Sequence, residues 1–295
     1  MYEELLTGAY DLHVHTGPDV MNRKLDDVEM AERLRARGMK GHGIKSHYFC
    51  TAERAKIINR VYEGYNAIGA ICLNNTVGGL NPIAVEMAAR DGAKIVWMPT
   101  FDAENEQQHL KVSKPENMPH WAKLRMEFAE KGKSLPTISL LADGSLKQEA
   151  VDVLEVIREH DLILATGHLS KEEVRTLVQE AARMGIRKIV ITHPNFPSLR
   201  LSKEEQKELA DLGATMEFCY TTPYTGKAAW ESVFEDIRYV GPEHCILSTD
   251  LGQPAYVYPD EGYLDFITQL IDKGGFSRED IRRMTAVNTA ALVES

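Results

Sequence analysis

The chain has 295 residues, of which 43% are hydrophobic and 26% charged, so it carries enough apolar material for a sizeable core and too much for a disordered chain. Its 34 basic and 44 acidic side chains give a formal net charge of −10, which argues against non-specific binding of nucleic acid and against a basic membrane-binding surface. No apolar stretch reaches the ~18 residues of a membrane helix, and the four cysteines form no Cys-x-x-Cys pair. We therefore expect a cytoplasmic protein without disulfides.

Eight short apolar runs predict β-strands. Several are nearly continuous in Val, Ile and Leu, which is typical of parallel strands that are covered on both faces. Between them, Ser170–Glu173 and Ser202–Glu205 match the capping box that begins a helix, and Ser277 with Asp280 is a weaker match. The predicted strands are Ala9–Val14, Lys40–Lys45, Ala67–Leu73, Ala93–Pro99, Asp161–Thr166, Lys188–Thr192, Ala214–Tyr220 and Cys245–Thr249.

The ends of these runs lie 25 to 30 residues apart, the usual length of a β-α unit, except for a gap of 68 residues between positions 100 and 168. Eight such units predict a single (β/α)8 TIM barrel domain over residues 1–295, with an insertion between strands four and five over about residues 101–146. In and after that insertion we expect a polar lid over Asp102–Pro119, a helix over His120–Lys131, an extra strand over Leu135–Leu141, and a helix over Gln148–His160. The alternative is that the extra strand is a ninth barrel strand.

The first predicted strand ends in the sequence Asp11-Leu-His-Val-His15. Residues two apart in a strand share a face, so His13 and His15 should project side by side while Leu12 and Val14 pack outward. Two imidazoles held in this way can chelate a metal ion. The alternative is a pair of hydrogen-bonded histidines inside the barrel.

Three more strands end in a polar side chain that metals bind, at His168, His193 and Asp250. In an eight-stranded β/α barrel these positions converge on the C-terminal rim, where barrel enzymes place their active sites. Four histidines and an aspartate on one rim favour a metal site.

The order His-x-His, His, His and Asp on strands one, five, six and eight resembles the amidohydrolase superfamily of metal-dependent hydrolases, over nearly the whole chain. The resemblance implies a distorted (β/α)8 barrel. It also implies that His13 and His15 hold one metal and that His168 and His193 hold a second or assist the first. Asp250 would bind metal and shuttle the proton of the attacking water.

One position departs from that pattern. Many members of the superfamily bridge two metals with a carboxylated lysine or a glutamate at the end of strand four, but here that run ends in Trp97-Met-Pro-Thr100. The second run ends in Lys45-Ser-His47 instead, and burying a lysine as an ammonium is costly. We expect Lys45 to be a metal ligand in carboxylated form. The alternative is that Lys45 pairs with Asp250 or with a substrate anion.

Three other side chains on the predicted rim are candidates for substrate binding: His47, Asp102 and Glu217. For each of them, an ordinary structural role is the alternative.

Imidazole and carboxylate ligands suit one or two divalent ions, zinc first, with manganese, iron or nickel as alternatives. The predicted reaction is hydrolysis of a C–N or C–O bond, as in an amide, cyclic amide, lactone or ester, in a small polar substrate.

Three alternatives stay open: a non-hydrolytic decarboxylase or isomerase of the same superfamily, a metal-dependent phosphoesterase, and a catalytically silent metal-binding protein. Phosphoesterases that begin with His-x-His typically end in Asp-x-His, whereas Asp250 is followed by Leu251-Gly252. The oligomeric state is open, since members of the superfamily commonly self-associate.

Overall fold

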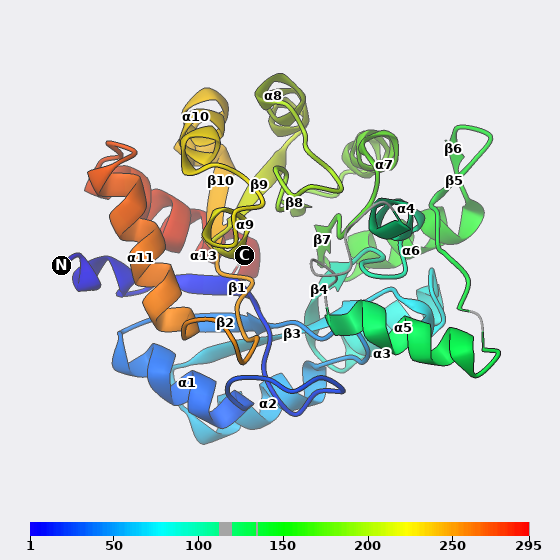
Figure 1. The fold of residues 1–295 in the computed structure, drawn as a ribbon, viewed down its shortest axis with the longest axis horizontal. Coiled ribbons are helices and arrows are strands. Elements are labelled where there is room, and N and C mark those ends of the chain that lie inside the picture. Colours follow the sequence, from blue (N-terminus) through cyan, green and yellow to red (C-terminus); the bar gives the residue numbers. More distant parts are fainter. Residues whose placement is uncertain (112–119, 134, 295) are drawn as a thin grey trace.

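The computed structural model describes residues 1–111, 120–133 and 135–294, and its centre is a nearly closed barrel of eight parallel strands. Neighbouring strands around the barrel follow one another in chain order, and each of the eight predicted strands is present. Figure 1 shows the helices around these strands, with α1, α2 and α3 below them and α7, α8 and α10 above. The barrel strands are β1 (Tyr10–Val14), β2 (Gly41–Ile44), β3 (Asn66–Cys72), β4 (Ala93–Trp97), β7 (Ile163–Ala165), β8 (Ile189–Thr192), β9 (Ala214–Cys219) and β10 (Cys245–Ser248).

The helices join successive strands and cover the outside of the barrel. The three predicted serine caps, at Ser170, Ser202 and Ser277, all form complete capping boxes at the starts of α7, α8 and α12. In the part of the chain that is described, no helix combines the length and apolar character needed to cross a bilayer. The helices outside the insertion are α1 (Asp27–Ala36), α2 (Ala52–Val61), α3 (Pro82–Arg90), α6 (Gln148–Glu159), α7 (Lys171–Arg183), α8 (Lys203–Asp211), α9 (Thr221–Tyr224), α10 (Trp230–Val240), α11 (Pro259–Asp272), α12 (Arg278–Arg282) and α13 (Asn288–Val293).

The chain between β4 and α6 differs from its prediction. The expected helix is present as α5 (His120–Glu130), but the expected polar lid begins with a helix, α4 (Glu104–Lys111), and its remaining residues 112–119 lie outside the described chain. The expected strand over Leu135–Leu141 is wrong. Ile138 makes only an isolated bridge to Ala103, and a small separate hairpin follows, formed by β5 (Leu141–Ala142) and β6 (Ser145–Leu146). The barrel therefore gains no ninth strand.

The core has two parts. One cluster of side chains fills the space between the strands and the outer helices, and a second fills the inside of the barrel, where Leu292 of α13 closes it. Val14 packs in the outer cluster, as predicted. Leu12 does not, because it packs inside the barrel with Ile68 and Ile95. The pairing of β1 with β2 shifts register between Asp11 and Val14, and such an irregularity breaks the strict alternation of faces.

The first and last strands meet at the point where the barrel closes. The backbone amide of Asp250 donates to the carbonyl of His13 at 2.8 Å, and the amide of His15 donates to the carbonyl of Leu251 at 2.8 Å. The buried carboxylate of Asp11 joins the same two strand ends, since it accepts from the hydroxyl of Thr249 at 2.5 Å and from the amide of Thr249 at 3.0 Å. These contacts place the end of β1 directly beside Asp250.

Candidate metal centre

Three of the predicted ligands meet where the barrel closes. The Oδ1 atom of Asp250 lies 3.1 Å from Nε2 of His13 and 3.2 Å from Nε2 of His15. Both imidazoles are buried, and Asp250 lies at the edge of the site with 17% of its side chain exposed. Ligand atoms that bind a metal at about 2.0–2.2 Å are separated from each other by roughly 3 Å, so this group has the dimensions of a coordination shell.

In each imidazole, the contact made by Nδ1 determines the protonation of Nε2, the nitrogen that faces Asp250. Nδ1 of His15 lies 3.0 Å from the backbone carbonyl of Lys45, and Nδ1 of His13 lies 3.1 Å from the carboxylate of Glu217. A carbonyl and a carboxylate can only accept, so both Nδ1 atoms carry the proton and both Nε2 atoms present a lone pair. Two lone pairs and a carboxylate oxygen that converge in this way form a favourable set of ligands for a metal ion.

A second possible ligand group surrounds the other side of His13. Glu217 Oε2 and Cys219 Sγ lie 3.1 and 3.6 Å from Nδ1 of His13. Burial raises the pKa of the Cys219 thiol well above its ordinary value, so the sulfur stays protonated and is a poor ligand. The set of His13, His15 and Asp250 is therefore the better candidate.

The pKa shifts of His15 and Asp250 suit metal binding, whereas that of His13 favours its protonated form. Burial lowers the pKa of His15 to about 3, so its imidazole is neutral near pH 7. Burial alone would raise the pKa of Asp250, but His13 and His15 hold it well below its ordinary value, and the side chain is a carboxylate. For His13, burial and Lys45 lower the pKa, but Asp250 and Glu217 outweigh them and raise it.

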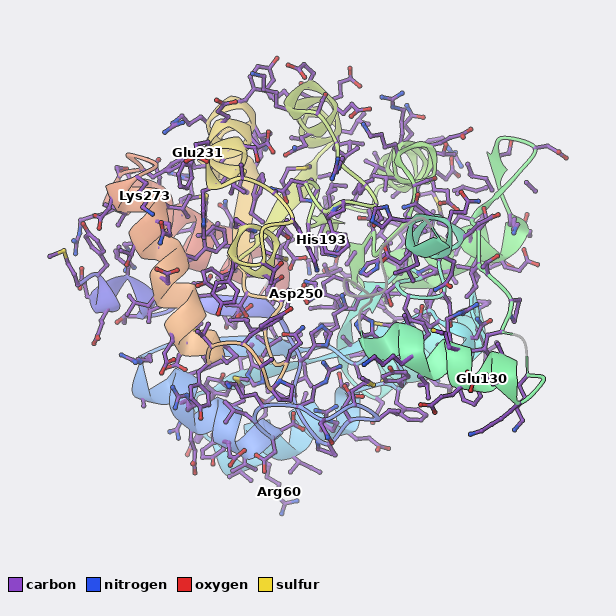
Figure 2. The ribbon with its side chains drawn as sticks, viewed as in Figure 1. Arg60, Glu130, His193, Glu231, Asp250 and Lys273 are labelled. Atoms are coloured by element: carbon purple, nitrogen blue, oxygen red, sulfur yellow. The ribbon has the colours of Figure 1, made fainter. Side chains whose placement is uncertain are left out.

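His168 and His193 form a second pair beside this group. Their ring centroids are 5.0 Å apart, and the ring of His193 lies 6.1 Å from that of His13. Burial lowers the pKa of His193 well below its ordinary value, which leaves it neutral. Figure 2 shows His193 and Asp250 close together near the middle of the molecule, whereas Arg60, Glu130, Glu231 and Lys273 lie at its edges. The structure thus gathers all four predicted histidines and Asp250 on one rim.

Two of these residues also have a rare backbone conformation. The φ angles of His193 and Asp250 are 30° and 54°, in the left-handed region that side chains other than glycine seldom adopt. Such strain costs about 1–3 kcal/mol and tends to occur at functional sites.

Lys45 reaches the centre from β2 and is almost fully buried, with 1% of its surface exposed. Its Nζ atom lies 2.8 Å from Nε2 of His13 and 4.0 Å from the centre of the Trp97 ring. Among the described residues, no carboxylate lies within ion-pair distance of Nζ. The proposed alternative of a direct pair with Asp250 is therefore not seen in this structure.

The three candidate substrate contacts have different surroundings. His47 stacks on His15 with ring centroids 4.9 Å apart and has Nδ1 2.9 Å from the hydroxyl of Thr100, so it borders the centre. Glu217 is fully buried and orients His13. Asp102 is also fully buried and is bound by Arg125 and by the backbone amide of Asn75, an arrangement that holds the insertion against β3 and β4.

Three residues near the centre do not appear in the prediction. Thr221 donates its hydroxyl to Oδ2 of Asp250 at 2.9 Å, and its position just after the strand β9 could have revealed it. Glu106 of α4 lies 3.4 Å from Nδ1 of His168. Lys227 has its Nζ 4.4 Å from the centre of the Phe196 ring, which in turn lies 4.5 Å from the His193 ring. Nothing in the local sequence of Glu106 or Lys227 marks them, because their partners lie in distant loops.

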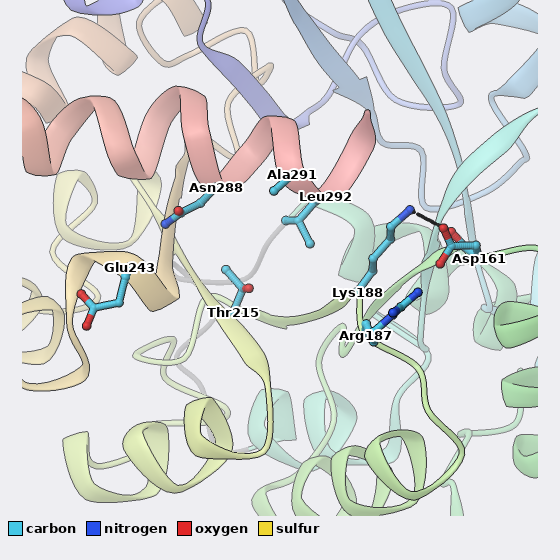
Figure 3. A pocket seen from close by; sticks show the side chains of 8 residues that line it. All are labelled: Asp161, Arg187, Lys188, Thr215, Glu243, Asn288, Ala291 and Leu292. Carbon is cyan, nitrogen blue, oxygen red and sulfur yellow. Dashed lines mark hydrogen bonds and ion pairs between the residues drawn. The ribbon is translucent and has the colours of Figure 1, made fainter. Parts of the chain in front are cut away.

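A cavity at the opposite end of the barrel is separate from this centre. It has a volume of about 490 Å³ and lies beside α13, between Asp161, Lys188, Thr215 and Leu292 (Figure 3). Lys188 is paired there with Asp161 at 2.7 Å. Because the active sites of such barrels lie at the C-terminal ends of the strands, this cavity is not the place of the chemistry.

A model of one protein family, described as a family of unknown function (DUF6282), matches residues 8–217. The chain belongs to this DUF6282 family. The match includes every proposed ligand except Asp250, which lies beyond its end. No curated protein matches the sequence.

Several solved structures have a similar fold. The probable dipeptidase PvdM from Pseudomonas aeruginosa has a TM-score of 0.63 at 12% identity, with 98% of this chain and 96% of that chain covered. An amidohydrolase from the same organism has a TM-score of 0.59 at 11% identity, with 98% and 97% covered. A beta-aspartyl dipeptidase from Fervidobacterium islandicum has a TM-score of 0.59 at 13% identity, with 97% and 72% covered. The predicted resemblance to the amidohydrolase superfamily is thus confirmed for the fold.

Proposed function

We propose that this DUF6282 protein is a metal-dependent hydrolase that cleaves a C–N or C–O bond in a small polar substrate. The observation that carries the proposal is the convergence of two imidazole nitrogens on one carboxylate oxygen, since Nε2 of His13 and Nε2 of His15 lie 3.1 and 3.2 Å from Asp250 Oδ1. The similarity of fold to an amidohydrolase and to a dipeptidase supports the choice of hydrolysis.

His13, His15 and Asp250 would hold the metal ion, and His168 and His193 would hold a second ion or assist the first. Nitrogen and oxygen ligands favour zinc, with manganese, iron or nickel as alternatives. When bound, such an ion acidifies a coordinated water and polarises a substrate carbonyl.

Asp250 is the proposed proton carrier. Its Oδ1 atom faces the two imidazoles, and its Oδ2 atom accepts from Thr221, so the carboxylate is held in one orientation. Because the pKa of Asp250 is low, it begins as a base, takes a proton from the attacking water and delivers it to the leaving group. Buried aromatic side chains line the neighbouring histidines, with the Trp97 ring centred 4.6 Å from the His13 ring and the Phe101 ring 5.7 Å from the His47 ring, and limit the access of bulk water there.

Lys45 is proposed to act as its carbamate. Its ammonium would lose one proton, and the free amine would then add to CO2, form an N–C bond and release a second proton, which converts a buried cation beside His13 into an anionic oxygen ligand. The lack of a carboxylate partner among the described residues supports this, since an unpaired buried ammonium is costly.

The substrate is proposed to carry an anionic group, because a lysine on the rim has no acidic partner among the described residues. Lys227 lies over Phe196 beside the histidines, and no carboxylate of the described chain lies within ion-pair distance of its ammonium. Arg23 is a second cation whose charge reaches the site, since it adds to the effect of burial in lowering the pKa of His15, but it is already paired with Asp19 at 2.6 Å. A carboxylate on the substrate would therefore find its partner in Lys227.

Metal analysis of the purified protein, followed by a screen of amides, lactones, esters and phosphoesters, tests the proposal. We expect bound zinc or manganese, and we expect Asp250→Asn to keep the metal while turnover falls about 10²–10⁴-fold. Protein with no metal and no affinity for zinc or manganese would contradict the metal site. Full turnover by D250N with metal bound would contradict the role of Asp250.

A further inference from the structure

Helix α4 of the insertion lies against two loops of the metal centre. The side-chain amide of Asn105 donates to three backbone carbonyls, those of His168 at 3.2 Å, Leu169 at 3.2 Å and Ser198 at 2.9 Å. The first two follow β7 and the third follows β8, so one side chain holds together the loops that carry His168 and His193. The backbone amide of His168 is also fixed, because it donates to the carbonyl of Pro99 at 3.0 Å.

The next residue of α4 faces the imidazole of His168. Glu106 is 3% exposed and His168 is 7% exposed, and the carboxylate Oε2 lies 3.4 Å from Nδ1. This distance is long for a hydrogen bond but short for an ion pair. Within the described chain neither atom has a hydrogen-bond partner. Buried polar atoms are rarely left alone, so each is the natural partner of the other.

The same arrangement occurs at the two histidines at the end of β1. Nδ1 of His13 faces Glu217, Nδ1 of His15 faces the carbonyl of Lys45, and in both cases Nε2 is left to face the centre. An acceptor at Nδ1 fixes the tautomer and raises the basicity of Nε2.

We propose that Glu106 is a positioning residue of the metal centre, which holds His168 in the Nδ1–H tautomer and presents its Nε2 lone pair to the metal. Asn105 holds the backbone of the same loop, so α4 is a structural part of the centre. The effect on metal binding rests on the proposed function, but the tautomer of His168 does not.

Nuclear magnetic resonance of histidine-labelled, metal-free protein tests the tautomer directly. Long-range ¹H–¹⁵N spectra should show His168 as the Nδ1–H tautomer in the wild type. Glu106→Leu removes the acceptor and should release this preference, whereas Glu106→Gln keeps an acceptor and should retain it. Glu104→Leu is the matched control, because Glu104 lies exposed on the same helix and its side chain accepts from the amide of Gln108, away from His168.

Zinc affinity, measured by competition with a chelator, gives the second readout. We expect E106L to bind zinc about 10–100-fold more weakly than the wild type, E106Q to lie between them, and E104L to equal the wild type. A His168 tautomer that is the same in E106L and the wild type would overturn the proposal. If E106L fails to fold, an E106Q variant with unchanged zinc affinity overturns it as well. Wild-type protein that binds no zinc would refute the proposed function, while the tautomer would still decide the role of Glu106.

Discussion

Substitution of Asp11 by asparagine is expected to remove a large pH dependence from the stability of the protein. Asp11 is fully buried, and burial raises its pKa from 3.8 to about 7 even though Thr249 and backbone amides donate to its carboxylate. A raised pKa means that the folded state prefers the protonated side chain. The stability that depends on this proton is fully present below pH 3.8 and is lost as the pH rises through about 7.

The size of the effect follows from the two pKa values. The gap between 3.8 in the unfolded chain and about 7 in the folded chain corresponds to about 4 kcal/mol in the free energy of unfolding. Between pH 5 and pH 8 the wild type should lose about 2.5 kcal/mol through Asp11 alone. Asparagine cannot ionise, and its amide can donate to the Thr249 hydroxyl while its oxygen accepts from the Thr249 amide, so the contacts survive.

Urea unfolding of the wild type and Asp11→Asn at pH 5 and pH 8, with EDTA present to remove metal, measures the difference. The D11N variant should gain about 2.5 kcal/mol relative to the wild type when the pH is raised from 5 to 8. Asp211→Asn serves as the control, because Asp211 is exposed at the end of α8. An equal pH dependence for the wild type and D11N would refute the reasoning, and so would a loss of relative stability by D11N at pH 8.

Two further predictions concern lysines at the centre. Zinc content and turnover of the wild type should rise when bicarbonate is added to CO2-depleted protein, whereas Lys45→Met should not respond. A wild type that is indifferent to bicarbonate would contradict the carbamate. For a substrate that carries a carboxylate, Lys227→Met should raise KM about tenfold with little change in kcat, and the esterified substrate should show no difference. Lys203→Met is the control, since Lys203 lies over Tyr239 on the outside of the barrel. Equal effects on both substrates would contradict a carboxylate-binding role for Lys227.

The strands and the ligand positions could be predicted because both depend on short local patterns. A strand such as Ile189–Thr192 is buried on both faces and so reads as a nearly continuous apolar run. A proposed ligand such as His193 follows such a run at once, and the geometry of a barrel brings all such strand ends to one rim.

The remaining features depend on partners that lie far away in the chain. Leu12 turns into the barrel because the pairing of β1 with β2 shifts, and a single strand carries no sign of its neighbour's register. Glu106 lies in a polar run without apolar periodicity, and its importance comes from His168, which is 62 residues further along the chain. The expected strand over Leu135–Leu141 was mistaken because an apolar run can also be an irregular segment that packs beside a helix.

The site joins the first and the last strand of the barrel. His15 and Asp250 are 235 residues apart, and β1 precedes the other seven barrel strands in the chain while β10 follows them. Contacts across so long a loop form late in folding, because closing the loop costs conformational entropy before the contact between its ends contributes any stabilisation. The three proposed metal ligands can therefore assemble only when every intervening β-α unit is in place. A bound ion would link the first strand of the finished barrel to the last, so the metal content of the protein would report complete folding. Newly made chains would stay metal-free until β10 had docked.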